Sequence, residues 1–288
     1  MPDLVVYERR RAGGDLPGVV RMRPRAGGDV SLSLRAPSTP VIPAGEDVVA
    51  AFLSRRPFYI SHRMGGAEFP EFTQSGLNAS LRAGFKALEL SVRRCASGEF
   101  VAIHDWKTSR TVPGTDYQIW NTPWSTLRTL RQASGGFMRL TDIIDQVPDD
   151  IVLAIDHKTT SSEDQRNPGD LADEEQLFDY LDTTFGGHPE RRVLWKVFAK
   201  GTGAKRAKAR GYKVMAMLYP NEVAASDLSQ WWDVIGMEWN AGADVWNRLN
   251  ASGKPTIAHI IVNEAQAQQA LAKGASGLMA SYPSRVHP

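Results

Sequence analysis

The chain has 288 residues, of which 42% are hydrophobic and 23% charged, and a formal net charge of +2. This balance is that of an ordinary globular protein, so it excludes wholesale disorder, and the weak net charge gives no reason to expect nucleic acid as a partner. No apolar run approaches the length of a transmembrane segment, and the single cysteine, Cys95, excludes an internal disulfide and a cysteine-rich metal site.

Residues 1–45 differ in composition from the rest of the chain. The charged N-terminus has no apolar stretch behind it, so we expect no signal peptide and a cytoplasmic location at synthesis. Two Gly-Gly pairs and an alternating run at 29–35 are typical of short strands, and the proline-rich run at 36–43 is typical of a linker. We therefore expect a short β-rich N-terminal extension at 1–45, either a flexible arm or a docking arm for an assembly partner, and one large domain at 46–288.

From Pro57 onward, short apolar runs alternate with segments of helical period. The predicted strands are 58–62, 87–92, 101–104, 151–155, 193–198, 214–218, 234–239, 256–261 and 277–280. The predicted helices are 74–83, 140–146, 174–184, 204–209, 227–232, 245–250 and 264–273. This alternation indicates parallel strands joined by right-handed crossovers, and eight such strands close a (β/α)₈ TIM barrel. The alternative is an open doubly wound sheet, but no GxGxxG motif follows the first strand.

Polar side chains end several of these predicted strands. In a TIM barrel the functional groups lie at the carboxyl ends of the strands, where unused charged residues are rare. The residues in question are His62, Arg63, Glu89, His104, Asp105, Asp156, Lys158 and Glu238. Each alone could be structural, as a satisfied histidine, a helix cap or an ordinary ion pair. Together, five polar strand ends predict a site.

The residue types indicate the chemistry of that site. Two histidines, His62 and His104, can take opposite roles in proton transfer near neutral pH. Carboxylates nearby suit a hard divalent cation with oxygen ligands. The combination predicts metal-assisted cleavage of an anionic ester.

The same residues carry a resemblance to the glycerophosphodiester phosphodiesterase family, which covers about residues 57–284. The stretch 62–66 followed by 70–73 resembles the family's HRG and PENT signature, and 87–92 resembles its ExD motif. Residues 97–105 resemble the run that ends in His-Asp, and 154–158 is similar to the E-x-K motif. Residues 259–263 and 274–283 resemble the family's closing motifs. The resemblance implies a TIM barrel with phosphodiesterase activity.

Catalytic and phosphate-binding roles follow from this resemblance. It implies that His62 and His104 are the general acid and base. It also implies that Arg63 holds the phosphate and that Lys158 supports phosphate or ligand placement.

The resemblance also implies a divalent metal ion, Mg²⁺ or Ca²⁺, with Glu89 and Asp156 as ligands. Glu71 occupies the signature acidic position and would bind metal or orient its neighbours. Ser91 stands where the family usually has Asp, which gives a neutral and weaker oxygen ligand. Ser281 likewise replaces an Asp of the closing motif. These departures bear on metal affinity and leave the two histidines unchanged.

The leading hypothesis is a phosphoric diester hydrolase. Its substrate would be a glycerophosphodiester of lipid metabolism, or a glycerol-phosphate polymer such as teichoic acid, cleaved to glycerol 3-phosphate and an alcohol. One alternative is a non-catalytic or weakly active barrel that serves as a binding or structural module, for example in a phage tail, and is then virion-associated. A further alternative is a phospholipase D-like lyase that stops at a cyclic phosphate.

Overall fold

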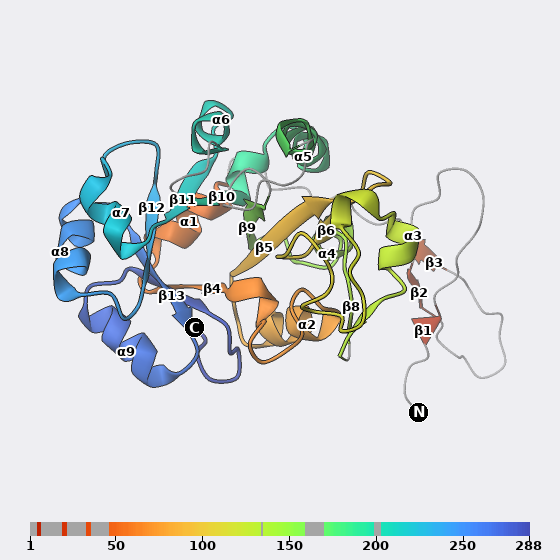
Figure 1. The fold of residues 1–288 in the computed structure, drawn as a ribbon, viewed down its shortest axis with the longest axis horizontal. Helices are drawn as coiled ribbons and strands as arrows, with labels where there is room; N and C mark the ends of the chain where they lie inside the picture. Colours follow the sequence, from red (N-terminus) through yellow and green to blue (C-terminus); the bar gives the residue numbers. More distant parts are fainter. Residues whose placement is uncertain are drawn as a thin grey trace.

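Eight parallel strands close into a barrel in the computed structural model of the chain (Figure 1). The structure describes residues 46–133, 135–158, 170–198 and 203–288, with the short segments 5–6, 19–21 and 33–35. The barrel strands are β4 (Phe58–Ser61), β5 (Ala87–Arg94), β9 (Val152–His157), β10 (Val193–Phe198), β11 (Lys213–Met217), β12 (Val234–Glu238), β13 (Thr256–Ile261) and β14 (Gly277–Ala280). They pair in chain order, and the pairing of Ser61 with Leu88 closes β4 on β5. The predicted TIM barrel is confirmed.

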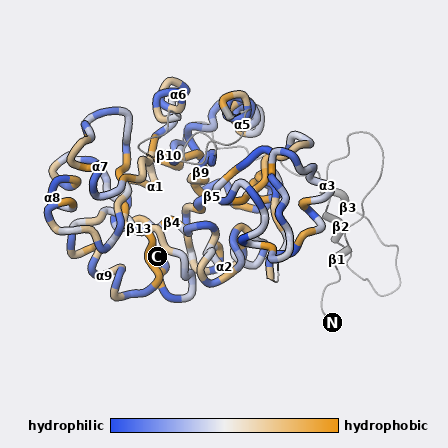
Figure 2. The backbone as a smooth tube through the Cα atoms, in the orientation of Figure 1, coloured by the Kyte–Doolittle hydropathy of each residue, from blue (hydrophilic) through white to orange (hydrophobic). Residues whose placement is uncertain are grey.

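Helices follow most of the strands and lie around the outside of the barrel (Figure 1). Those that surround it are α2 (Gln74–Arg82), α4 (Leu140–Ile144), α5 (Asp170–Thr184), α6 (Gly203–Ala209), α7 (Pro220–Ala225), α8 (Ala243–Ala251) and α9 (Glu264–Ala272). In Figure 2 the turns of α5 and α6 alternate between hydrophilic and hydrophobic, as expected for helices with one face on the barrel. Within the described residues, no helix is long and apolar enough to cross a membrane.

The amino end of the barrel is filled by apolar side chains. Helix α1 (Val48–Ser54) begins after Asp47, whose side chain accepts the Ala50 N–H at 2.7 Å. Its buried residues join one apolar cluster with strand residues that alternate along the chain. These include Phe58 and Ile60 of β4, and Leu194 of β10. Because alternate strand residues face the same side, the next residues in these series face the interior at the carboxyl end.

One predicted strand is not part of the barrel wall. β6 (Phe100–Ala102) pairs antiparallel with β5, and the chain then makes a long excursion before α4. The excursion contains η2 (Ile119–Asn121), α3 (Trp124–Leu127), β7 (Arg131–Gln132) and β8 (Gly135–Gly136). It packs on a small apolar cluster of its own, which includes Val101, Ile103 and Ile119. The hairpin thereby holds His104 beside the carboxyl end of β5.

The predicted helix at 227–232 is wrong. The helix in this part of the chain is α7, which begins earlier, with Pro220 in its first turn and the Glu222 side chain accepting the Tyr219 N–H at 2.8 Å. Asp227 instead accepts hydrogen bonds from the backbone N–H and the hydroxyl of Ser229, which favour a turn. The apolar spacing alone did not reveal this competition.

Three short strands of the N-terminal extension are described. β1 (Val5–Val6), β2 (Val19–Arg21) and β3 (Ser33–Arg35) form an antiparallel sheet, and β3 lies within the alternating run at 29–35. The predicted linker at 36–43 lies outside the described residues. The boundary at 45/46 and the docking role stay predictions.

Candidate active site

Charged residues replace apolar ones at the carboxyl end of the barrel interior. On β9 the inward series runs from Val152 and Ala154, in the apolar cluster, to Asp156. The sheet register sets Ser91 of β5 and Lys196 of β10 on either side of Asp156. Three neighbouring strands therefore present Ser91, Asp156 and Lys196 in one row.

Two carboxylates and two lysines form a buried ion cluster in and around this row. Lys196 Nζ lies 2.8 Å from Glu89 Oε1 and 3.1 Å from Asp156 Oδ2. Lys158 Nζ lies 2.8 Å from the same Asp156 oxygen. None of the four residues is more than 4% exposed. We call Glu89, Asp156, Lys158 and Lys196 the ion cluster. With all four groups ionised, its two negative and two positive charges cancel.

The electrostatics of the cluster favour the charged forms of Glu89 and Lys196. Burial raises the pKa of Glu89, but the nearby ammonium groups, Lys196 foremost, lower it by more than burial raises it. The resulting pKa is about 2. Burial lowers the pKa of Lys196, but the attraction of Glu89 and Asp156 outweighs burial and the net pKa is raised. Lys158 differs, because burial and the charge of Lys196 leave its pKa lowered.

His62 and Arg63 lie in a tight turn, η1 (His62–Met64), directly after β4. Arg63 and Met64 have φ of 49° and 53°, a left-handed conformation that costs a side-chain-bearing residue about 1–2 kcal/mol. The turn is held from below, because Glu89 Oε2 accepts the Arg63 N–H at 2.9 Å. It is also held from the side, because Gly76 of α2 packs so closely that a Cβ there would lie 2.3 Å from the Met64 carbonyl oxygen.

The side chain of His62, the first residue of this turn, is buried. Its Nδ1 and the Ser281 hydroxyl share a hydrogen bond of 2.6 Å. Burial lowers the pKa of His62 well below its ordinary value, although Glu89 acts in the opposite direction. His62 is therefore neutral at pH 7 and able to accept a proton.

His104 is oriented by a carboxylate. Asp105 Oδ1 lies 2.7 Å from His104 Nδ1, and Asp105 Oδ2 accepts a hydrogen bond from Arg110. Arg110 also reaches Glu71 at 2.7 Å, and Glu71 lies 2.5 Å from Arg63 Nη1. A continuous chain of ion pairs thus joins the two histidine-bearing loops. Burial lowers the pKa of His104, and its hydrogen bond to Asp105 opposes that shift.

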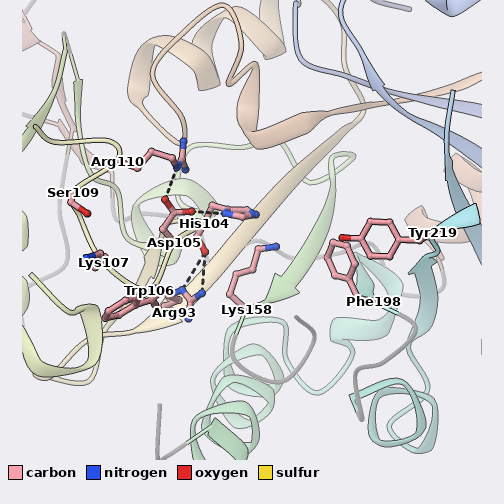
Figure 3. Close-up of a pocket in the computed structure, with 10 residues that line it drawn as sticks. All are labelled: Arg93, His104, Asp105, Trp106, Lys107, Ser109, Arg110, Lys158, Phe198 and Tyr219. Carbon is pink, nitrogen blue, oxygen red and sulfur yellow. Dashed lines mark hydrogen bonds and ion pairs between the residues drawn. The ribbon is translucent and has the colours of Figure 1, made fainter. Parts of the chain in front are cut away.

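A pocket of about 450 Å³ opens beside His104 (Figure 3). In the figure, Lys158 points between the His104 group on one side and Phe198 and Tyr219 on the other. Among the described residues, the basic side chains that line the pocket are Arg93, Lys107, Arg110 and Lys158, and the one lining carboxylate is Asp105. A cationic pocket with aromatic walls suits an anionic ligand that carries an organic group.

The structure brings most of the sequence-predicted residues together. Glu89, Asp156 and Lys158 share the ion cluster, and the Ser91 hydroxyl donates weakly to Glu89 at 3.4 Å. Glu71 instead faces two arginines, as a residue that orients its neighbours would. The catalytic, phosphate-binding and metal-binding roles of all these residues stay predictions.

Sequence reasoning missed Lys196 and His259. Lys196 is the one charged residue in an otherwise apolar strand, at an inward position between Leu194 and Phe198. A charged residue at such a position indicates a buried partner, so the sequence contains a signal for it. His259 follows Ile257 in the inward series of β13. Desolvation lowers the pKa of His259 to about 3, and its charged form would repel both His62 and Lys196.

The carboxylates that the family resemblance implies as metal ligands contact a lysine ammonium in this structure. In the described part of the chain, no three His, Cys, Asp or Glu side chains converge on one point. The two carboxylates that come together, Glu89 and Asp156, both bind the Lys196 ammonium. A divalent cation would have to displace that ammonium, so this donor set does not fit the expected ion.

Comparisons with known proteins agree with this fold. The model of the Glycerophosphoryl diester phosphodiesterase family matches residues 62–279, so the chain belongs to that family, whose members are phosphoric diester hydrolases. A search of curated protein sequences found no relative.

Solved structures of similar fold are those of phosphodiesterases. An Oleispira antarctica phosphodiesterase, in complex with the product sn-glycerol-3-phosphate, is 20% identical with a TM-score of 0.62, over 80% of this chain and 95% of that one. A Parabacteroides distasonis glycerophosphoryl diester phosphodiesterase is 16% identical with a TM-score of 0.62, over 82% and 88%. The glycerophosphodiester phosphodiesterase of Thermotoga maritima is 16% identical with a TM-score of 0.60, over 80% and 96%. At these identities the likeness concerns the fold.

Proposed function

We propose that the chain hydrolyses glycerophosphodiesters to glycerol 3-phosphate and an alcohol, with His62 and His104 as its acid and base. The observation that carries this proposal is the setting of His104, which is oriented by Asp105 and opens on a cationic pocket. Family membership supports the reaction class. The Oleispira antarctica relative, bound to sn-glycerol-3-phosphate, supports the choice of product.

The diester anion would bind between Arg63 and Lys158. Both cations lie close enough to His104 to influence its pKa, and Lys158 projects into the pocket. Cationic donors at this position offset the charge that repels a nucleophile and that grows on the phosphoryl oxygens in the transition state. Trp106, Phe198 and Tyr219 line the pocket and would contact the alcohol group.

The two histidines would divide the proton transfers between them. His62 is neutral and would take the proton from the attacking hydroxyl, either water or a neighbouring glycerol hydroxyl. Asp105 stabilises the imidazolium form of His104, which would give its Nε2 proton to the leaving alkoxide as the phosphorus–oxygen bond breaks. If the attack is internal, a cyclic phosphate forms first, and water opens it with the roles reversed.

Dependence on Mg²⁺ or Ca²⁺ has less support from the geometry. When bound, such an ion would act as a Lewis acid on a phosphoryl oxygen. Glu89 and Asp156 are the carboxylates that would hold it, and Lys196 lies between them.

The test is release of glycerol 3-phosphate from glycerophosphocholine and from poly-glycerol-phosphate by the wild-type chain, His62→Ala and His104→Ala. We expect release by the wild type and its loss in both variants. A ligand that binds equally to all three chains without turnover would instead indicate a binding module. A cyclic phosphate that persists would indicate a lyase.

A further inference from the structure

We propose that the Lys196 ammonium takes the place of the divalent metal ion in this chain, so that its phosphodiester cleavage needs no bound metal. The inference rests on the proposed function for its catalytic part. Its structural part is that a lysine ammonium lies between the two carboxylates, and this part rests on the contacts of the ion cluster alone.

The Lys196 ammonium lies between the two carboxylates. Lys196 Nζ lies 2.8 Å from Glu89 and 3.1 Å from Asp156, so one nitrogen bridges carboxylates from two different strands. These are the carboxylates that the sequence indicates as metal ligands. The side chain is 5% exposed and starts from an inward position of β10, level with Asp156 in the sheet register. The position of Lys196 on β10 therefore places its ammonium between the two carboxylates.

The charges of the ion cluster also oppose a divalent cation. With its two carboxyl and two amino groups ionised, the buried cluster is neutral. A divalent cation would raise the charge of this buried volume by one if it displaced the Lys196 ammonium and by two if it joined it, and uncompensated buried charge is costly. Ser91, in the same row, contributes a hydroxyl and no charge to balance them.

Lys196 also supports the turn that carries His62 and Arg63. Glu89 accepts the Lys196 ammonium with Oε1 and the backbone N–H of Arg63 with Oε2. Lys196 thus holds the carboxylate that holds the turn with His62 and Arg63. It is a positioning residue, and it also supplies positive charge beneath the phosphate site.

The first test uses the purified wild-type chain. Bound Mg²⁺ and Ca²⁺ are measured by mass spectrometry, and thermal unfolding is followed with each ion and with chelator. We expect well below one ion per chain, an unchanged Tm, and the same rate of glycerophosphocholine cleavage in chelator as in metal. Close to one bound ion per chain, or a rate that chelator abolishes and Ca²⁺ or Mg²⁺ restores, would overturn the proposal.

The second test moves the charge. In Ser91→Asp/Lys196→Ala the ammonium is replaced by a third carboxylate, so we expect Tm to rise with Ca²⁺ or Mg²⁺ and calorimetry to show binding. Lys213→Met is the matched control, since Lys213 starts the neighbouring strand β11 and pairs with Asp47 at 2.7 Å, away from the cluster. An equal response of wild type, control and double variant to the ions would contradict the proposal.

The third test separates positioning from folding. Lys196→Met is expected to lose about 10- to 100-fold in activity, the range for groups that orient others in a site, while Lys196→Arg keeps more. Circular dichroism checks that both fold. Full activity in a folded Lys196→Met would overturn the proposal. If the wild type cleaves no glycerophosphodiester, the proposed function fails, and metal content and melting still decide whether Lys196 excludes the ion.

Discussion

The two ends of the barrel interior are built on the same strands and differ only in their side chains. At the amino end, the inward residues of β4, β9 and β10 are apolar and pack against α1. Two residues further along, the same series presents His62, Asp156 and Lys196. The backbone register is shared, so the difference lies in which residues occupy the inward positions.

The two layers have different roles, because the apolar layer stabilises the barrel and the charged layer carries the groups of the candidate site. The apolar layer stabilises the barrel by removing apolar surface from water. The charged layer is buried to a similar degree, so each of its groups needs a counter-charge, and the ion cluster supplies one for each. Substitutions in the apolar layer should therefore lower stability and leave the chemistry of the site unchanged. Substitutions in the charged layer should change that chemistry.

The largest expected effect breaks the charged end without touching the apolar one. His104→Ala should lower kcat/KM by about 10²- to 10⁴-fold, the usual contribution of a general acid or base, with little change in Tm. The control is His188→Ala, at an exposed histidine next to η3 (Pro189–Arg191). Steady-state kinetics on glycerophosphocholine measures both. Equal activity in the two variants would remove His104 from the mechanism.

Loss of the bridging ammonium should be the most costly change for folding. Lys196→Met leaves Glu89 and Asp156 buried side by side, and breaking a buried ion pair in this way costs about 3–5 kcal/mol. Urea unfolding at pH 7 measures the free energy of unfolding. A loss below that of Lys213→Met would mean that the bridge is not formed.

A cavity created by substitution in the apolar layer, two residues earlier on β10, should lower stability without changing the chemistry. Leu194→Ala should lower the free energy of unfolding by about 2–5 kcal/mol, because Leu194 is fully buried in the apolar layer. Below its Tm, the variant should keep wild-type kcat and the wild-type pH profile. A change in pH profile would show that the two layers are coupled.

The smallest expected effect is a shift in pH dependence. The groups that act on His104 are Asp105 and Asp156, which raise its pKa, and Lys158 and Arg63, which lower it together with burial. As the general acid, His104 works below its pKa, which burial lowers from its ordinary value, so kcat/KM should fall as pH rises through the pKa of His104.

Asp105→Asn removes a contribution that raises the pKa of His104, so the alkaline fall in kcat/KM should move to lower pH. Asp116→Asn is the control, since Asp116 is exposed and pairs with Lys107. A pH profile measured for both variants checks the direction. A shift to higher pH in Asp105→Asn would contradict the assignment of His104 as the acid.

The sequence predicted the barrel because strand and helix periodicities are local properties. All eight barrel strands and β6 lie close to their predicted positions. The ion cluster was harder to predict, because it depends on which strands are neighbours and on their register. Glu89 and Asp156 could be recognised from motifs, whereas Lys196 acquires its meaning only from Asp156 beside it. The helix at 227–232 failed for a local reason, the turn chemistry of Asp227.

Phosphorus NMR of glycerophosphocholine incubated with the wild-type chain tests the central claim most directly. The account predicts that the phosphodiester resonance disappears and that the resonance of glycerol 3-phosphate, a phosphomonoester, replaces it, with His104→Ala leaving the diester intact. A diester resonance that stays unchanged with folded wild-type protein, in chelator and in Mg²⁺ or Ca²⁺ alike, would contradict the assignment of this site as a glycerophosphodiester phosphodiesterase.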